Sequence, residues 1–431
     1  MDPSFWTRGV WRYPDFRLYW LAASTSSFGS VMSAYALPMA VVITFHGGPQ
    51  DTARLMVFQA VGGLLGALLA GFLVKARAGQ RVLVASYGAM VAVLAVPPLL
   101  FWAGHLKLWH LLALPFFVAF AASFGAAGQP LILPRIVQTH EIPEANNQVW
   151  IGVGISLAAG PILAGFLVHF ITPVNVIGVV SLLYLFSAAA ISKLQLREEA
   201  QGEEGPSAKT PAWTHLFGSI AWSLRHPSVA ALLFAKFGGV LFTGMAGTVA
   251  MYYRLEGLHL SPAEVGFIGS LTSPGFLLGP LITGLLVRRL GPGRVALVGA
   301  IGVGLGSLAL PAARGSLLAI FAILVVGGIL GDMAAMAYGS MEQALYQMIV
   351  PSQRRPQVAS FQVTLSNLGT LLGPVLGLAM TQSLPSVTIL WISGAGMILT
   401  ALPMAFTPLM QRVPVPAPEE GQRAPSVETT P

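Results

Sequence analysis

Two ionisable residues interrupt long apolar stretches of the sequence and are the strongest candidates for chemistry. Lys236 lies within the stretch 229–255, and Asp332 lies within the stretch 317–350. With the inner membrane boundary placed near Tyr338 to Met341 on the second stretch and near Val229 on the first, each charge lies about 10 Å deep, at ~1.5 Å per residue. The two charges therefore lie at similar depths. Where the two helices adjoin, their side chains would pair or share a water network, in a contact that protonation or solute binding would break.

Charges at such positions need an explanation, because an ionisable side chain inside a membrane costs several kcal/mol and is retained for a partner or a pathway. A second interpretation stays open: Lys236 extends to lipid headgroups and Asp332 bonds a neighbouring helix. Glu342 lies farther along the same stretch as Asp332, and we expect it at a solvated helix end.

The sequence contains none of the common catalytic or metal-binding signatures. It has no cysteine, which excludes thiol catalysis, disulfides and cysteine-ligated metal sites. It lacks the phosphate loop G-x-x-x-x-G-K-[ST], the zinc motif H-E-x-x-H and the nucleophile motif G-x-S-x-G. We therefore expect no enzymatic activity, no metal and no cofactor.

The composition indicates a protein that crosses a membrane many times. Hydrophobic residues make up 55% of the 431 residues and charged residues 9%, with a mean hydropathy of +0.73. A soluble domain carries about 25% charged residues. This composition therefore excludes a soluble enzyme, a nucleic-acid-binding protein and a disordered chain.

Twelve apolar runs approach or exceed the roughly 20 residues that a membrane-spanning helix needs. None alternates with a period of two, so the pattern favours helices over a β-barrel. The runs are 18–45, 55–74, 82–104, 111–137, 150–170, 176–194, 229–255, 265–287, 295–313, 317–350, 361–384 and 385–408. With a cytoplasmic N-terminus, the cytoplasmic segments hold 18 lysines and arginines and the outer loops hold four. The positive-inside rule therefore predicts that both termini are cytoplasmic.

The chain divides into five parts. Residues 1–17 form a cytoplasmic segment, 18–194 and 229–408 each form a six-helix bundle, 195–228 form a cytoplasmic linker with an amphipathic piece, and 409–431 form a disordered cytoplasmic tail. The two bundles are predicted to be repeats. GALLAGFLVKARAGQRV, which begins at Gly66, aligns with GPLITGLLVRRLGPGRV, which begins at Gly279, at an offset of 213 residues. An even number of helices per repeat predicts an axis along the membrane normal.

The same offset pairs the Gly-Pro dipeptide of AAGPILAG (158–165) with that of LLGPVLG (371–377). With the repeated loops and with EIPEANN (141–147) and VPSQRRPQV (350–358), these segments resemble the major facilitator superfamily, and in particular its bacterial drug and siderophore exporters. The resemblance implies an all-α fold of twelve transmembrane helices in two pseudo-symmetric bundles that rock around a central site. It also implies a multi-pass monomer in the bacterial inner membrane that moves a small organic solute. Proton coupling is left open.

The resemblance assigns roles to two groups of residues. The first group forms inner-gate loops: Gly71, Lys75, Arg81, Gly284, Arg288 and Arg294. The family places an acid where Lys75 and Arg288 stand, so the inner gate must close differently here. The second group forms Gly-Pro motifs on helices that slide between the halves, with static packing as the alternative: Gly160, Pro161, Gly165, Gly373, Pro374 and Gly377.

The family architecture places the stretches that carry Lys236 and Asp332 together at the central cavity, where we expect both side chains to lie. It also suggests which other side chains face the cavity, although helix packing explains such positions as well. The candidates are Tyr35, Gln129, Phe242, Tyr252 and Met336. Their chemistry suits a lipophilic or amphipathic solute, since a phosphate would need two or more buried arginines. We expect an exporter of drug-like or siderophore-like compounds, with proton antiport as the drive. An uncoupled facilitator or importer, and a membrane sensor or assembly protein that transports nothing, stay open as alternatives.

Overall fold

The computed structural model describes residues 9–74, 79–196, 222–351 and 354–410, and within these residues the chain is helical throughout, with no strand. Twelve helical segments are long and apolar enough to cross a membrane, as predicted. In the first half the helices are α1 (Pro14–Met39), α2 (Pro49–Leu73), α3 (Gly79–Trp102), α4 (Leu108–Gly128), α5 (Ile142–Phe170) and α6 (Pro173–Ser192). In the second half they are α8 (Pro227–Tyr252), α9 (Pro262–Thr272), α10 (Pro274–Leu290), α11 (Pro292–Ala312), α12 (Leu317–Ile349), α13 (Arg355–Met380) and α14 (Ser386–Ala401).

Proline residues and side-chain caps mark where many of the helices begin. Proline occupies one of the first two positions of most helices, where its missing N–H costs no hydrogen bond. The Ser261 hydroxyl accepts a hydrogen bond from the backbone N–H of Glu264 at the start of α9. Pro274 then separates α9 from α10, and together they form one span, Pro262–Leu290. The predicted disordered tail begins two residues too early, because Leu409 and Met410 end a short 3-10 helix in which Leu409 is buried. The rest of that tail and most of the predicted amphipathic linker piece lie outside the described residues.

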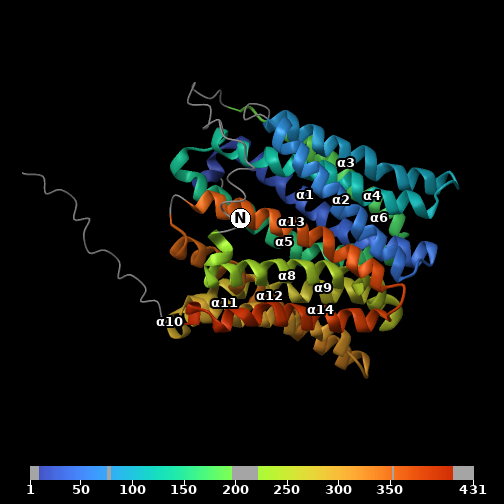
Figure 1. Cartoon of the computed structure of the whole chain (residues 1–431). Coiled ribbons are helices and arrows are strands. Elements are labelled where there is room, and N and C mark those ends of the chain that lie inside the picture. Colours follow the sequence, from blue (N-terminus) through green and yellow to red (C-terminus); the bar gives the residue numbers. More distant parts are fainter. Residues whose placement is uncertain (1–8, 75–78, 197–221, 352–353, 411–431) are drawn as a thin grey trace, which may run out of the picture.

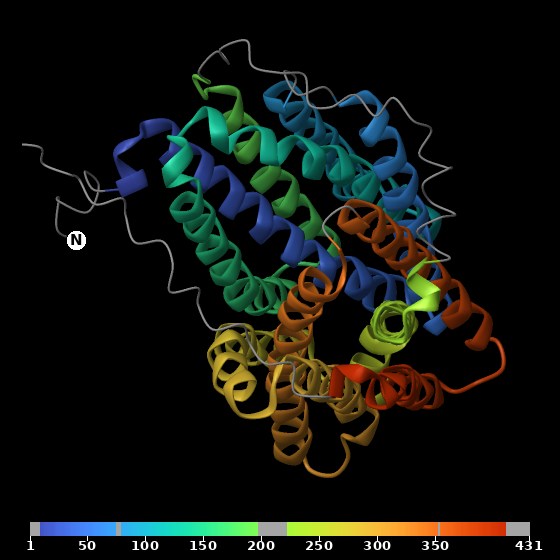
Figure 2. The ribbon, with the colours of Figure 1, turned by 60° about the vertical axis from the view of Figure 1, so that its left-hand side comes forward.

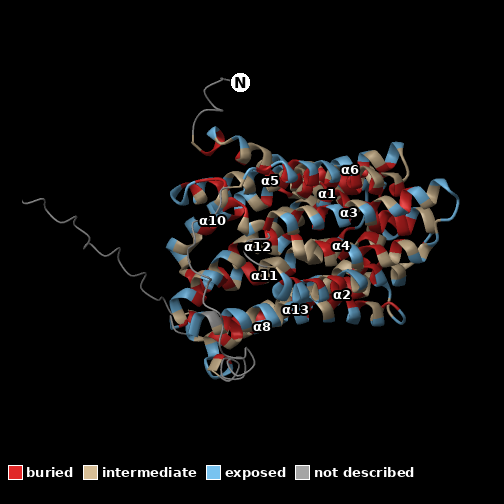
Figure 3. Cartoon of the chain, turned by 90° about the horizontal axis from the view of Figure 1, so that it is seen from above, coloured by how far each residue is buried: buried red, intermediate tan, exposed pale blue. Residues whose placement is uncertain are grey.

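The two halves lie side by side with their helices roughly parallel (Figures 1 and 2). We name the end at which α1 and α8 begin the linker end, because α6 also finishes there. The opposite end, with the connections between α1 and α2 and between α11 and α12, is the far end. Burial is dense inside the first half, whereas exposed side chains follow the outer helix faces (Figure 3). This arrangement is that of the predicted twelve-helix fold.

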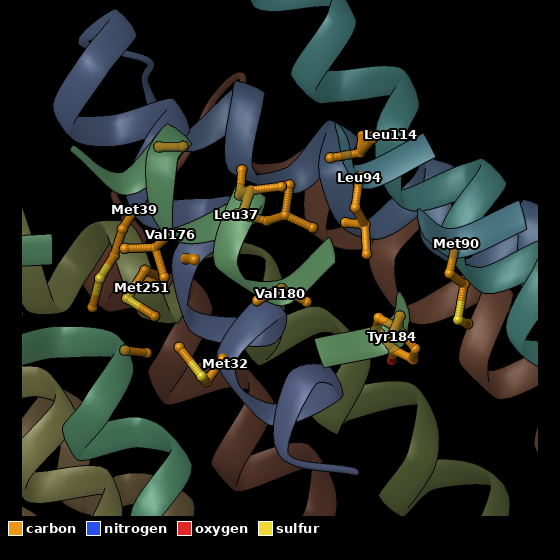
Figure 4. Packing of buried hydrophobic residues seen from close by; sticks show 14 of the residues in the cluster. Met32, Leu37, Met39, Met90, Leu94, Leu114, Val176, Val180, Tyr184 and Met251 are labelled. Atoms are coloured by element: carbon orange, nitrogen blue, oxygen red, sulfur yellow. The ribbon is translucent and has the colours of Figure 1, made fainter. Parts of the chain in front are cut away.

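Among the described residues, the two halves share an apolar core only at the far end. One cluster of buried residues joins the first half to the far-end turns of α8, and Figure 4 shows Met251 in it together with Met39 and Val176. A separate cluster fills the linker end of the second half, with Val229 of α8 and Leu345 of α12 among its members. The halves are therefore packed together at the far end and have separate cores at the linker end.

Helices α5 and α9 cross at two glycines, which lets them pack closely at the far end. Gly165 and Gly266 face each other so closely that a methyl group on either would overlap backbone of the other helix. The Ile162 N–H donates to the Ser270 hydroxyl across this crossing at 3.0 Å. Close backbone approach is the usual role of small residues where membrane helices meet.

Replacing Gly165 with leucine should separate α5 from α9 and destabilise the protein by about 1–3 kcal/mol, the usual cost of overpacking. The measurement is the thermal unfolding midpoint of the purified protein. Gly154→Leu is the matched control, because Gly154 lies on the same helix with no neighbouring atom near the position of a Cβ. Equal midpoints for the two variants would contradict the role assigned to the crossing.

Candidate functional site

A cavity of about 760 Å³ lies between the two halves at mid-depth. Helices α2 and α4 of the first half and α8, α11, α12 and α13 of the second supply its walls. The lining residues are Met56, Gln59, Ala60, Gly63, Leu64, Ala67, Ala119, Ser123, Lys236, Gly239, Val240, Thr243, Gly244, Val303, Ala335, Tyr338, Gly339, Asn367, Thr370 and Pro374. Among these, only Lys236 carries a charge. The walls are thus largely apolar, with scattered amide and hydroxyl groups.

Lys236 forms an ion pair with a buried carboxylate behind the cavity wall. Its Nζ lies 3.0 Å from Glu342 Oε2, and the Gln362 amide donates to Glu342 Oε1 at 2.7 Å. The Lys236 side chain is 30% exposed and the Glu342 side chain 1%. Three helices therefore meet at one carboxylate: α8 through Lys236, α12 through Glu342 and α13 through Gln362.

This arrangement explains how a carboxylate persists in an apolar bundle. A buried ion that loses its partner is strongly destabilising, whereas one that is paired and fully hydrogen-bonded is tolerated. Lys236 and Gln362 each contact one carboxylate oxygen, and the Tyr338 hydroxyl donates to the Leu232 carbonyl nearby at 3.5 Å. The prediction of a solvated position for Glu342 was wrong.

The predicted partner of Lys236 was also wrong, and the assumed membrane boundary is the reason. We placed that boundary near Tyr338 to Met341 and counted depth from it, whereas α12 is one helix from Leu317 to Ile349, close to the predicted run 317–350. At ~1.5 Å per residue, Asp332 lies about 26 Å from the Ile349 end and Glu342 about 10 Å. Lys236 lies about 14 Å from the linker end of α8 by the same rise. Lys236 and Glu342 therefore lie at similar distances from the linker end, and Asp332 lies too far from that end to reach Lys236.

Asp332 lies closer to the far end, outside the wall of the cavity. Ala335 and Glu342 follow Asp332 by three and ten residues, and this spacing places all three on one face of α12. At its own level, however, Asp332 faces the junction of α9 and α10, where its Cβ would nearly touch a methyl group on Gly275. The Thr272 hydroxyl lies beside its carboxyl group. Asp332 is therefore half-buried against this junction, near the middle of α12.

The predicted lining residues pack elsewhere, so that prediction was wrong for the cavity that the structure contains. The set was Tyr35, Gln129, Phe242, Tyr252 and Met336. Phe242 lies over Gly396 of α14, and Met336 lies against Gly279 of α10. The Tyr35 hydroxyl reaches across to Gly269 of the other half. These large side chains fill the gaps that glycines leave between helices.

Gln129 and Tyr252 lie at helix ends. Gln129 begins a short 3-10 helix after α4, with its side chain beside the Tyr19 hydroxyl. Tyr252 is the last residue of α8 at the far end. Neither position borders the cavity.

The loop residues predicted for the inner gate are exposed where the structure describes them. Gly71 and Gly284 have open space around the position of a Cβ, and Arg81, Arg288 and Arg294 are exposed. Lys75 lies outside the described residues. Their part in gating stays a prediction.

The two Gly-Pro motifs pack differently. Gly160 lies against Val31 of α1, while Pro161 and Gly165 meet α9 of the other half. In the second motif, Gly373 and Gly377 press against α8 within their own half, and Pro374 lines the cavity. The first motif therefore lies where the halves meet, and the second supports the helix that carries Lys236.

Residues 19–255 and 232–430 match the sequence profile of the Major Facilitator Superfamily. The chain belongs to this superfamily. It is thus a multi-pass membrane protein of a transporter superfamily.

It is 27% identical to the enterobactin exporter EntS of Salmonella paratyphi A over 198 residues, which is 44% of this chain and 45% of that protein. It is 26% identical over 202 residues to EntS of Escherichia coli O1:K1, covering 45% and 46%. The matched stretches thus span a little under half the length of these relatives.

Solved superfamily structures share the fold. A bacterial homologue of the iron transporter ferroportin in an inward-facing state is 18% identical, with a TM-score of 0.66 over 92% of this chain and 99% of the other. The nucleoside transporter NupG is 13% identical, with a TM-score of 0.70 over 91% and 98%. At these identities the likeness concerns the fold alone.

Replacing Lys236 with methionine should destabilise the protein by about 3 kcal/mol or more, because the buried Glu342 carboxylate loses its partner. Adding Glu342→Gln should restore most of this loss, since a neutral amide no longer needs the cation. Thermal unfolding midpoints of the two single variants and the double variant form the test. Additive losses in the double variant would show that the two side chains are not coupled.

Proposed function

We propose that this protein exports an amphipathic organic solute from the cytoplasm across a bacterial inner membrane, by alternating access and in exchange for protons. One observation carries the proposal: a largely apolar cavity with a single charged contact lies between two halves that share a core at only one end. Such a cavity can open at the linker end without breaking the far-end core.

The excess of lysine and arginine in segments at the linker end supports a cytoplasmic position for that end. The conformation described here would then be closed to the outside by α5 and α9. A solute would enter from the cytoplasm and leave when the far end opens. The partial likeness to enterobactin exporters supports the outward direction.

Lys236 is the proposed solute contact. An ammonium group among apolar walls suits a solute that combines an apolar body with an acidic or hydrogen-bond-accepting group. The Asn367 and Thr370 side chains on α13 offer further polar contacts along the same cavity. Glu342 holds Lys236 in place while the cavity is empty.

Asp332 is the proposed proton carrier. It lies beyond the cavity, where α9 and Tyr35 meet at the far-end closure. Opening the far end would expose its carboxyl group to the outside, where it could take up a proton. After the far end closes and the linker end opens, Asp332 would release the proton to water in the cavity, whose wall includes Ala335 one turn away on the same helix face. The proton would then leave to the cytoplasm, which completes antiport with the outgoing solute.

The test uses everted membrane vesicles with an imposed proton gradient and labelled enterobactin as the probe. We expect gradient-driven accumulation with the natural chain and loss of most of it with Lys236→Met/Glu342→Gln, which removes the cation and keeps the fold. Ethidium, a lipophilic cation, should be accumulated poorly, since the cavity offers a cation as its only charged contact. Enterobactin accumulation that survives unchanged in the double variant would contradict the role of Lys236.

Asp332→Asn separates transport from coupling. We expect it to abolish accumulation against a gradient while exchange of labelled for unlabelled solute across the vesicle membrane continues. Transport that is independent of protons and unchanged in Asp332→Asn would identify a facilitator. Absence of flux for a panel of organic solutes would favour a sensor or assembly protein.

A further inference from the structure

A second hollow of about 320 Å³ lies on the outer side of the second half, between α10 and α11, with α12 as its floor. It shares no lining residue with the central cavity, and nearly all of its lining is apolar. The residues are Gly279, Ile282, Thr283, Leu286, Val295, Val298, Gly299, Gly302, Leu305, Gly306, Gly327, Leu330, Met333, Ala334 and Ala337. We refer to it as the outer groove.

The outer groove exists because α10 and α11 each pack on α12 but touch each other little. Gly279 brings α10 onto Met336, and Gly302 brings α11 onto Ala334. The rim between them is formed by large apolar side chains that face outward. Val298 is 53% exposed, Leu305 58% and Leu330 56%. In a membrane these side chains meet acyl chains.

Arginines stand at the linker end of the outer groove. Arg289 lies one turn beyond Leu286 on α10, and Arg294 lies one turn before Val298 on α11. Each arginine therefore lies on the same helix face as the groove-lining residues of its helix. Arg288 is their neighbour, and the connecting turn RRLGPGR contains no acid. All three arginine side chains are exposed.

We propose that the outer groove binds one acyl chain of a phospholipid whose anionic headgroup is held by Arg289 and Arg294. An apolar slot that opens to the bilayer accepts a hydrocarbon chain. Arginine suits the phosphate, because its guanidinium donates two parallel hydrogen bonds. Basic pockets between membrane helices at the cytoplasmic face are a recognised setting for anionic lipids.

A bound acyl chain would pack against the face of α12 that points away from the central cavity. Ala334 and Ala337 belong to the floor of the outer groove, whereas Ala335 and Gly339 line the cavity. The helix that carries Glu342 therefore has the lipid site on one face and the cavity on another. The lipid site itself does not depend on which solute is transported.

The test is native mass spectrometry of the full-length protein released from micelles that hold equal amounts of phosphatidylglycerol and phosphatidylethanolamine with identical chains. Two arginines should favour the anionic lipid by roughly twenty-fivefold, at about fivefold for each basic residue. Arg289→Gln/Arg294→Gln should bring the two lipids to equal retention. Lys193→Gln/Arg225→Gln is the control, because it removes the same charge from exposed positions elsewhere at the linker end.

A second pair of variants tests the hydrocarbon part. Val298→Trp should fill the outer groove and lower retention of phosphatidylglycerol severalfold. Val326→Trp makes the same change at a 55% exposed position of α12 outside the groove and should leave retention unchanged. Size-exclusion profiles of all variants confirm folding and report the oligomeric state.

Equal retention of both lipids by the natural chain would overturn the proposal. An effect of the arginine variants without an effect of Val298→Trp would overturn it as well, since that result describes a basic surface without a groove. A dimer that Val298→Trp converts to a monomer would show that a second copy of the chain occupies the groove.

Discussion

The Glu342 carboxylate is the charge around which the inner faces of the second half are arranged. It is almost completely buried, and it is stable there only because Lys236 and Gln362 reach it from two other helices. Those three helices, α8, α12 and α13, also supply most of the second half's share of the cavity wall. The ion pair therefore fixes the relative position of the elements that a solute would touch.

The first half has the same helices without this charge. At the repeat offset of 213 residues, Gln129 stands in place of Glu342 and Ala23 in place of Lys236. Gln129 lies beside the Tyr19 hydroxyl, so a neutral contact occupies the corresponding place between α1 and α4. The fold thus does not need the ion pair, and its presence in one half is a difference in chemistry on a common framework.

The division of the apolar residues into two cores determines which end of the protein opens more easily. A single core ties the halves together at the far end, and the α5–α9 crossing permits backbone contact there. At the linker end the second half has its own core. Rotation of one half against the other can therefore change the linker end while each half stays packed, and opening the far end requires the shared core to separate. The two ends differ in the energy that opening them costs.

Much of the fold follows from the sequence, because a membrane span needs only an apolar run of sufficient length and the repeat reveals the symmetry. The site was harder to predict. Lys236 was found because a lone charge in an apolar run is conspicuous, but its partner depended on where the membrane boundary crosses α12, and apolarity marks the ends of that helix without marking the boundary. Phe242 and Met336 were misplaced because their orientation is decided by glycines on neighbouring helices, Gly396 and Gly279, which no pattern within one helix reveals.

The central claim is that the halves open at one end as they close at the other. The chain has no cysteine, so pairs of spin labels can be introduced directly. One pair would join Gln138 to Gln347 at the linker end and another would join His105 to Gln382 at the far end, all at exposed positions. Distances measured by double electron–electron resonance in lipid nanodiscs, between pH 5.5 and 8, should show two populations for each pair. As the short linker-end distance gains population, the long far-end distance should gain with it. A single distance for each pair that does not change with pH or on Asp332→Asn, or two ends that open together, would contradict the account.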